Sequence, residues 1–159
     1  MTSRVVIDAL RVLLIAALAM IVLTQVVILP WLSGVVAREL PDEAFMRWPI
    51  LGLAVLGLLC VEVAVISTLL LLRLTREDRV FTKQAFAWVD AIIGAFMAAA
   101  LVCLATIAYQ SMTVAGPFLW TVALWGGVLG GVGMGLLMWT MRALLVQATS
   151  LRADMEMVI

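Results

Sequence analysis

Four long stretches of the chain are almost wholly hydrophobic, and charged residues gather between them. The stretches cover residues 12–32, 49–72, 88–110 and 117–141. A helix that crosses a bilayer needs about 20 mostly apolar residues, since the hydrocarbon core is about 30 Å thick and each residue rises about 1.5 Å. Backbone polar groups in lipid must be satisfied within their own segment, so each stretch is expected to be helical. The pattern predicts an all-α fold, an integral membrane four-helix bundle.

The charged residues between these spans predict their orientation. Of the 10 Lys and Arg residues, only Arg38 and Arg47 flank one side of the predicted spans, and all the others flank the opposite side. The side with the basic excess normally faces the cytoplasm. Both termini and the connection at residues 73–90 are therefore expected to be cytoplasmic. The outer connections, residues 33–48 and 111–116, are too short to hold a folded receptor domain.

Composition supports lipid as the main solvent of this chain. Hydrophobic residues make up 66% of the 159 positions, charged residues make up 13%, and the mean hydropathy is +1.23. Soluble domains average about 45–50% apolar and about 25% charged residues. The first stretch is longer than the apolar part of a signal peptide and lacks a clear cleavage site, so it is expected to be retained. No linker, repeat or low-complexity tract divides the chain, and residues 1–159 are expected to form one membrane domain.

The side chains that usually carry catalysis are scarce. Histidine is absent, and the net charge is +0, so there is no basic excess for direct nucleic-acid binding. Cys60 and Cys103 lie inside apolar stretches, far from any metal-ligand spacing, and are expected to be reduced core residues. No catalytic triad, paired-carboxylate site or nucleotide fingerprint is present. We expect neither an enzyme nor a bound cofactor.

Glu62 is the most informative single residue, because it lies near the middle of the second span. A carboxyl group at that depth costs about 2.5–3.5 kcal/mol on insertion scales, so it should face the bundle or water. One interpretation is structural: a hydrogen bond to Gln25 or Thr24 on the first span, which would hold the helices in register. The other is functional: a site for a proton, an ion or a ligand.

Small residues cluster in the fourth span, where glycines four residues apart form overlapping GxxxG pairs. Such residues let another helix approach closely. The third span offers a matching small surface, so packing within the chain is favoured, and a face for a homo-oligomer is the alternative. The candidate packing residues are Gly126, Gly127, Gly130, Gly131 and Gly135 in the fourth span, with Gly94 and Ala98 in the third.

Beyond Met141 the chain keeps a helical pattern but changes character. Apolar residues recur at spacings of three and four, which predicts an amphipathic cytoplasmic helix over residues 142–159 that extends the fourth span. Two arginines are matched by two acidic residues there, so docking on a protein helix, or folding back on residues 73–90, fits better than binding anionic lipid. The connection 73–90 is either a solvated turn or part of the same surface. The candidate docking residues are Leu144, Ala148, Leu151, Met155, Val158, Phe81 and Phe86.

Two segments of the sequence resemble a known family. They are Val80-Phe-Thr82 followed by Phe86-Ala-Trp-Val-Asp90, and the ending from Met141 to Ile159. Together with the four-span layout they resemble the actinobacterial branch of the domain-of-unknown-function 2975 family, over nearly the whole chain. The resemblance implies a small protein of the bacterial plasma (inner) membrane with no established activity. Members are often encoded beside a small helix-turn-helix regulator, which implies a cytoplasmic transcriptional regulator as a partner.

The favoured function is a membrane-embedded interaction or sensory protein that docks such a regulator through residues 142–159 and 73–90. The alternative is a small transporter or channel subunit in which Glu62 binds a proton or a cation. An assembly or immunity factor for a larger envelope complex is a third class. The sequence names no signal and no substrate for any of them.

Overall fold

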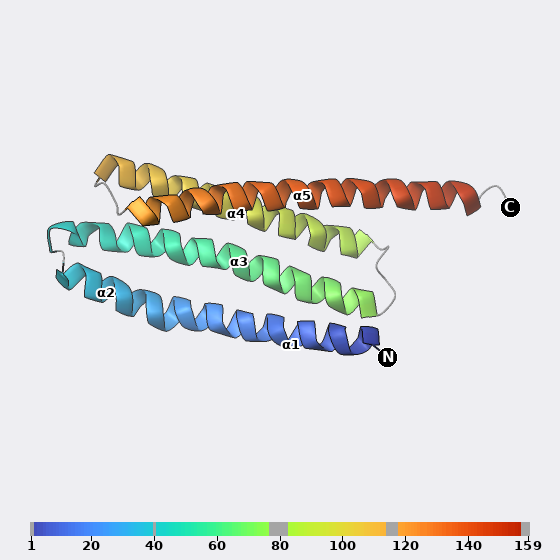
Figure 1. The fold of residues 1–159 in the computed structure, drawn as a ribbon, viewed down its shortest axis with the longest axis horizontal. Coiled ribbons are helices and arrows are strands. Elements are labelled where there is room, and N and C mark those ends of the chain that lie inside the picture. The colour runs from blue at the N-terminus through green and yellow to red at the C-terminus, as the bar shows by residue number, and fades with distance from the viewer. Residues whose placement is uncertain (1, 40, 77–82, 114–117, 157–159) are drawn as a thin grey trace.

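The computed structural model of the chain is all α-helical (Figure 1). It describes residues 2–39, 41–76, 83–113 and 118–156. The elements, in chain order, are α1 (Thr2–Leu23), the π-helical turn η1 (Thr24–Ile28), α2 (Leu29–Glu39), the 3-10 helix η2 (Pro41–Met46), α3 (Arg47–Arg76), α4 (Lys83–Thr113) and α5 (Phe118–Glu156). In the described residues, four helical stretches are long and apolar enough to cross a membrane, as expected of a multi-pass membrane protein: Val5–Glu39, Ala44–Leu74, Ala85–Thr113 and Phe118–Ala148.

The helices reach further than the apolar stretches that predict them. Most of the predicted outer connection 33–48 is helical, since α2 continues to Glu39 and α3 already begins at Arg47. Backbone hydrogen bonding does not stop where the side chains become polar, so a helix continues into the interface until a residue ends it. Pro41 is such a residue, because proline disfavours the helical conformation at the position before it.

A π-helical turn separates α1 from α2 without interrupting the helix. It covers Thr24–Ile28, and Pro30 follows directly in α2. The proline ring lacks an N–H and clashes with the carbonyl of the residue four positions earlier, Val26. A locally wider turn relieves that clash and re-satisfies the freed backbone groups, as is common where proline lies in a membrane helix. Pro30 is therefore the physical reason for the turn.

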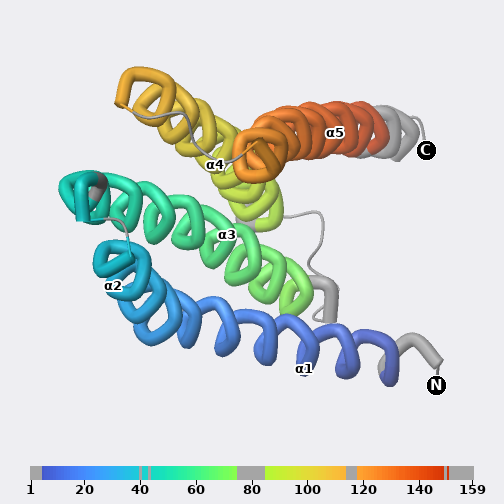
Figure 2. Tube along the Cα trace, turned by 60° about the vertical axis from the view of Figure 1, so that its left-hand side comes forward, coloured from blue at the N-terminus to red at the C-terminus, as the bar shows by residue number. Residues whose placement is uncertain are grey.

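Each helix packs on its neighbours in the chain. α4 lies between α3 and α5 and contacts both, and α1 and α2 contact α3. Figure 2 shows α1 and α5 at opposite edges of this arrangement. In the described residues, neither α1 nor α2 packs extensively on α5. The helices thus form an open layer in the order α1/α2, α3, α4, α5.

The most shielded side chains follow α4. Those below a tenth of full exposure include Ala85, Ile92, Ile93, Ala95 and Ala100 of α4, with Val128 of α5. Two buried polar groups, Ser67 and Thr106, lie on α3 and α4, and the Thr106 hydroxyl donates to the carbonyl oxygen of Val102 at 2.8 Å. The first span contributes no buried side chain to its most apolar window. The core is therefore the three-helix part α3–α4–α5.

Both ends of the described chain lie at the same end of the layer (Figure 1). The beginning of α1 and the end of α5 point in one direction, and α5 projects past the ends of the other helices. An even number of crossings requires this arrangement.

Candidate functional site

The closest approach between two helices lies where α5 crosses α4. A Cβ atom at Gly131 would stand 2.9 Å from the carbonyl oxygen of Phe96 and 3.0 Å from the Cβ atom of Ala100. Both distances are shorter than ordinary van der Waals contact, and a backbone oxygen cannot move aside. Gly131 is therefore the point at which only a hydrogen atom fits.

The glycines one turn above and below Gly131 extend this contact. A Cβ atom added at Gly127 would lie 2.8 Å from Cys103 Sγ. One added at Gly135 would lie 3.0 Å from Met97 Sδ. The flexible side chain of Met97 can adjust, so Gly135 is the more tolerant position. The spacing of four residues is the GxxxG pattern, and in the structure it serves the packing of α5 on α4.

The remaining small residues of the predicted packing set point elsewhere. Gly126 and Gly130 are exposed, and a Cβ atom at either would meet no atom within 4 Å. Gly94 of α4 is open in the same way, whereas Ala98 is half-buried. Ala100, which the sequence pattern did not single out, contacts Gly131 instead. The glycines of α5 thus serve two faces of the helix, of which one is occupied by α4.

A charged pair fastens α5 to α4 near the end that carries the termini. Arg142 Nη2 donates to Asp90 Oδ2 at 2.9 Å, and Arg142 Nε forms an ion pair with the other carboxylate oxygen. The guanidinium carbon lies 6.0 Å from the centre of the Phe86 ring. One hydrogen bond and one ion pair to the same carboxylate hold the guanidinium against α4. We call Arg142, Asp90 and Phe86 the clamp.

The sequence places Arg142 and Asp90 on the same side of the membrane but does not pair them. Their pairing depends on the register between antiparallel helices, which the close contact at Gly131 sets. Phe86, predicted as a docking residue, is half-buried beside the guanidinium. Phe81 and Val158 lie outside the described residues.

Two polar side chains of the first two spans have buried atoms. Glu62 Oε1 and Gln25 Nε2 are buried and have no hydrogen-bond partner in the described parts of the chain. Gln25 lies in the π-helical turn, and the hydroxyl of its neighbour Thr24 donates back to the Met20 carbonyl at 2.8 Å. A buried polar atom without a partner costs about 1–3 kcal/mol. The two buried atoms are therefore a candidate site.

Helix register explains why Glu62 and Gln25 do not meet. Arg47 Nε donates to Ser33 Oγ at 3.3 Å and fixes α3 against α2. At about 1.5 Å per residue, Glu62 lies roughly 22 Å from Arg47 along α3. Gln25 lies roughly 12 Å from Ser33 along the first span, in the same direction. The two side chains are thus about 10 Å apart in depth, which is nearly two helical turns. The structure brings together the helices that carry them, but not the residues themselves.

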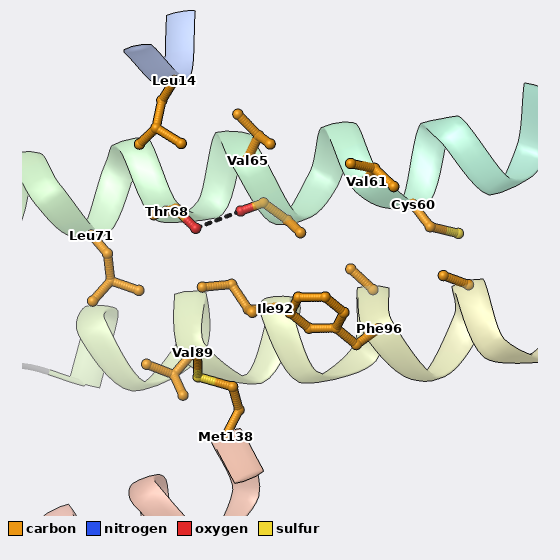
Figure 3. A pocket seen from close by; sticks show the side chains of 13 residues that line it. Leu14, Cys60, Val61, Val65, Thr68, Leu71, Val89, Ile92, Phe96 and Met138 are labelled. Carbon is orange, nitrogen blue, oxygen red and sulfur yellow. Dashed lines mark hydrogen bonds between the residues drawn. The ribbon is translucent and has the colours of Figure 1, made fainter. Parts of the chain in front are cut away.

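An apolar groove of about 420 Å³ runs between α3 and α4 (Figure 3). Leu14 of α1 and Met138 of α5 lie on its opposite sides in this view. Its only hydroxyl group, on Thr68, donates to the Ala64 carbonyl at 2.8 Å and is therefore satisfied within α3. Such a lining suits hydrocarbon and offers no polar anchor for a substrate. In the described residues no group of three His, Cys, Asp or Glu side chains could hold a metal ion.

The predicted docking face of α5 is exposed as far as its side chains are described. Leu144 is 61% exposed, and Ala148 is exposed as well. The side chains of Leu151 and Met155 lie outside the described ones, although α5 is helical to Glu156. Nothing in the described chain packs on this face.

Comparison with known families and structures gives one match. The model of a family described as "Protein of unknown function (DUF2975)" matches residues 31–159. The match includes the second, third and fourth spans and begins inside α2, so α1 lies before it. No curated protein and no solved structure matches the chain.

Proposed function

The chain belongs to this DUF2975 family, and from that membership we propose that it is a bacterial inner-membrane protein that docks a cytoplasmic helix-turn-helix regulator. The basic excess on one side of the spans supports a cytoplasmic location for both termini. The docking surface would be the end of α5 together with the connection between α3 and α4. It would act as a membrane-embedded interaction or sensory element.

The observation that carries this proposal is the length of α5. Its 39 residues extend roughly 58 Å at about 1.5 Å per residue, whereas the hydrocarbon core is about 30 Å thick. A tilt cannot absorb so large an excess, because membrane helices tilt by about 20° on average. A long part of α5 would therefore leave the bilayer, and in Figure 1 α5 projects past the other helices at the end that carries the termini.

The clamp supports the same proposal, because it determines where the projecting part begins. Arg142 is tied to Asp90, and α4 runs back from Asp90 only to Lys83. In antiparallel register Lys83 is level with about residue 149, so the rest of α5 extends beyond α4. Because α5 is unbroken and is held to α4 at Arg142, its residues beyond Arg142 keep a fixed direction relative to α4.

Exposed leucine and alanine side chains just beyond the clamp, beside the first turns of α4, give a partner a reason to bind. Burial of a leucine side chain contributes about 1.5–3 kcal/mol in water. Leu144 and Ala148 share one face of the helix, as an amphipathic ligand for a protein groove requires.

Co-purification with a helix-turn-helix regulator of the kind encoded beside family members tests the proposal. We expect Leu144→Glu to reduce recovery of the regulator at least about tenfold, equivalent to about 1.4 kcal/mol. Ala143→Glu is the matched control, since Ala143 is exposed on the neighbouring face and should leave recovery unchanged. Full recovery with a chain that ends at Met141 would overturn the proposal.

A second candidate function rests on the unpartnered buried oxygen of Glu62. Ionisable groups inside a membrane commonly mark proton or ion pathways, so a transporter or channel subunit is the rival. Flux of protons and alkali cations into liposomes that contain the purified chain tests it. The rival requires flux that Glu62→Gln abolishes, and the absence of flux from the unmodified chain would exclude it for these ions.

A further inference from the structure

The apolar groove between α3 and α4 is as long as one leaflet of the bilayer is deep. Along α3 its lining runs from Cys60 to Leu71, and along α4 it runs from Ala99 to Val89. At about 1.5 Å per residue these stretches measure roughly 16 Å and roughly 15 Å. Half of the hydrocarbon core is about 15 Å thick, and one acyl chain spans that depth.

The two ends of the groove lie at the middle of the spans and at one of their boundaries. Cys60 is central in the apolar stretch 49–72, and Ala99 is central in the stretch 88–110. At the opposite end, the lining on α4 reaches the residue directly before Asp90 of the clamp. The groove therefore runs from the centre of the bilayer to the polar boundary on the side of the termini.

Small side chains that meet across the helix pair keep this space open. A Cβ atom at Gly57 would lie 3.6 Å from Val102 Cγ1, and this contact gives the antiparallel register of α3 and α4. In that register, small residues of the lining lie level with each other, so neither helix fills the gap. The level pairs are Cys60 with Ala99 and Ala64 with Ala95.

The volume of the groove distinguishes a hydrocarbon chain from a partner helix. A helix with its side chains is about 10 Å wide, so a 16 Å length of it occupies more than about 1,000 Å³. The groove holds about 420 Å³. A helix therefore cannot enter the groove, whereas a single acyl chain matches it in length and in width.

We propose that the groove binds one acyl chain of a phospholipid from the leaflet on the side of the termini. An unfilled groove would cost its lining the dispersion contacts that a chain along its axis restores. The lining makes no polar demand on that chain, because the Thr68 hydroxyl is already bonded within α3. The phosphate would lie at the polar boundary, where Arg73 is exposed two residues beyond Leu71 and supplies positive charge.

The bound chain would touch all four spans and not a single helix face. The lining includes Leu14 of α1 and Met138 of α5, on opposite sides of the α3–α4 pair (Figure 3). Met138 lies about one helical turn before Arg142, so the chain would contact α5 directly beside the clamp. This lipid site involves no soluble protein and goes beyond the proposed function.

Photocrosslinking with lipid probes tests where the chain lies. The purified full-length protein is reconstituted in vesicles of phosphatidylethanolamine and phosphatidylglycerol, with a diazirine on one acyl chain of the phosphatidylglycerol. A diazirine at the methyl end of the chain should label the protein near Cys60 and Ala99. A diazirine beside the ester group should label it near Leu71 and Val89. Peptide mass spectrometry locates the labels, and the reverse order of labelling would overturn the proposal.

Leu129 of α5 is the internal reference for lipid that merely surrounds the protein. It is 71% exposed, and it lies near the depth of Ala99, because the neighbouring Gly131 packs on Ala100. We expect the methyl-end probe to label Ala99 and its neighbours at least about tenfold more than Leu129, equivalent to about 1.4 kcal/mol. Equal labelling at the two places would show that the groove holds only bulk lipid, and would overturn the proposal.

Blocking the groove gives a second measurement. In native mass spectrometry after extraction in mild detergent, we expect the unmodified chain to retain one phospholipid and Ala64→Phe to retain at least about tenfold less. Ala105→Phe is the matched control, because Ala105 is exposed on α4 outside the groove. Ala99→Leu blocks the same space with a smaller side chain, should Ala64→Phe fail to fold. Equal retention by a folded blocked variant and by the control contradicts the site, whatever the outcome for regulator docking.

Discussion

At the scale of single residues, the missing methyl group of Gly131 determines how closely α5 can approach α4. The sequence shows glycines four residues apart but gives several such pairs, and nothing in their spacing says which pair faces the neighbouring helix. The structure assigns Gly127, Gly131 and Gly135 to α4 and leaves Gly126 and Gly130 open. The choice depends on the rotation of α5 about its axis, which is a tertiary property.

Gly131→Ala should therefore destabilise the protein by about 1–3 kcal/mol, because overpacking against a carbonyl oxygen forces the two helices apart. Gly94→Ala is the control: its Cβ atom would meet nothing, and alanine gains about 1 kcal/mol of helix propensity over glycine. Denaturant titration in detergent micelles measures both. Equal stability of the two variants would show that the close contact at Gly131 does not exist.

Substitution of Gln25 is expected to stabilise the protein, in contrast to Gly131→Ala. Its amide nitrogen is buried without a partner, so Gln25→Leu should raise the free energy of unfolding by about 1–3 kcal/mol. Thr24→Val serves for comparison, since the Thr24 hydroxyl already has a backbone acceptor and its loss should bring no such gain. A destabilised Gln25→Leu variant in thermal unfolding would mean that the amide has a partner in the membrane.

At the scale of elements, hydropathy alone identifies the centres of the four spans, because only helices satisfy their backbone in lipid. The ends are less predictable: α1 and α4 extend past the apolar stretches, since hydrogen bonding continues through the interface, whereas the helical spacing beyond Met141 does predict that α5 continues. The π-helical turn was missed although the sequence carries its signal. Pro30 lies inside an apolar stretch, and a proline at such a position requires either a kink or a wider turn.

Substitution of Pro30 and of Pro49 tests whether Pro30 causes the π-helical turn. Pro30→Ala restores a donor and removes the clash, and should stabilise the chain by up to about 3 kcal/mol. Pro49→Ala should change little, because Pro49 lies in the first turn of α3, where its missing N–H has no acceptor to lose. Thermal unfolding in micelles compares them. Indistinguishable variants would rule out Pro30 as the cause of the turn.

At the scale of the whole molecule, the sequence predicts the number and sequence order of the spans, but not which helices touch. A four-helix bundle is the simplest expectation for four apolar helices, and it stays a prediction. The described chain shows an open layer in which α4 is central and the first span is peripheral. Hydropathy carries no information on this point, because every face of these helices is apolar.

The orientation of the whole molecule is testable with single cysteines. In a chain with Cys60→Ala and Cys103→Ala, Asp42→Cys should react with a membrane-impermeant maleimide in intact cells, and Ser150→Cys should react only after the cells are opened. The reason is the concentration of Lys and Arg on the side of the termini. Labelling of Ser150→Cys in intact cells would reverse the topology and remove the docking proposal.

The packing of each helix on its predecessor also bears on how the protein is made. Spans leave the ribosome in order, and contacts between neighbours in the chain close small loops, which favours fast folding. A nascent chain that ends in a linker after Thr113, long enough for α4 to leave the ribosome, should already hold α3 against α4, and protection of its introduced cysteines from alkylation would report that pair. When α5 emerges, the surface that receives Gly131 is already in place beside it.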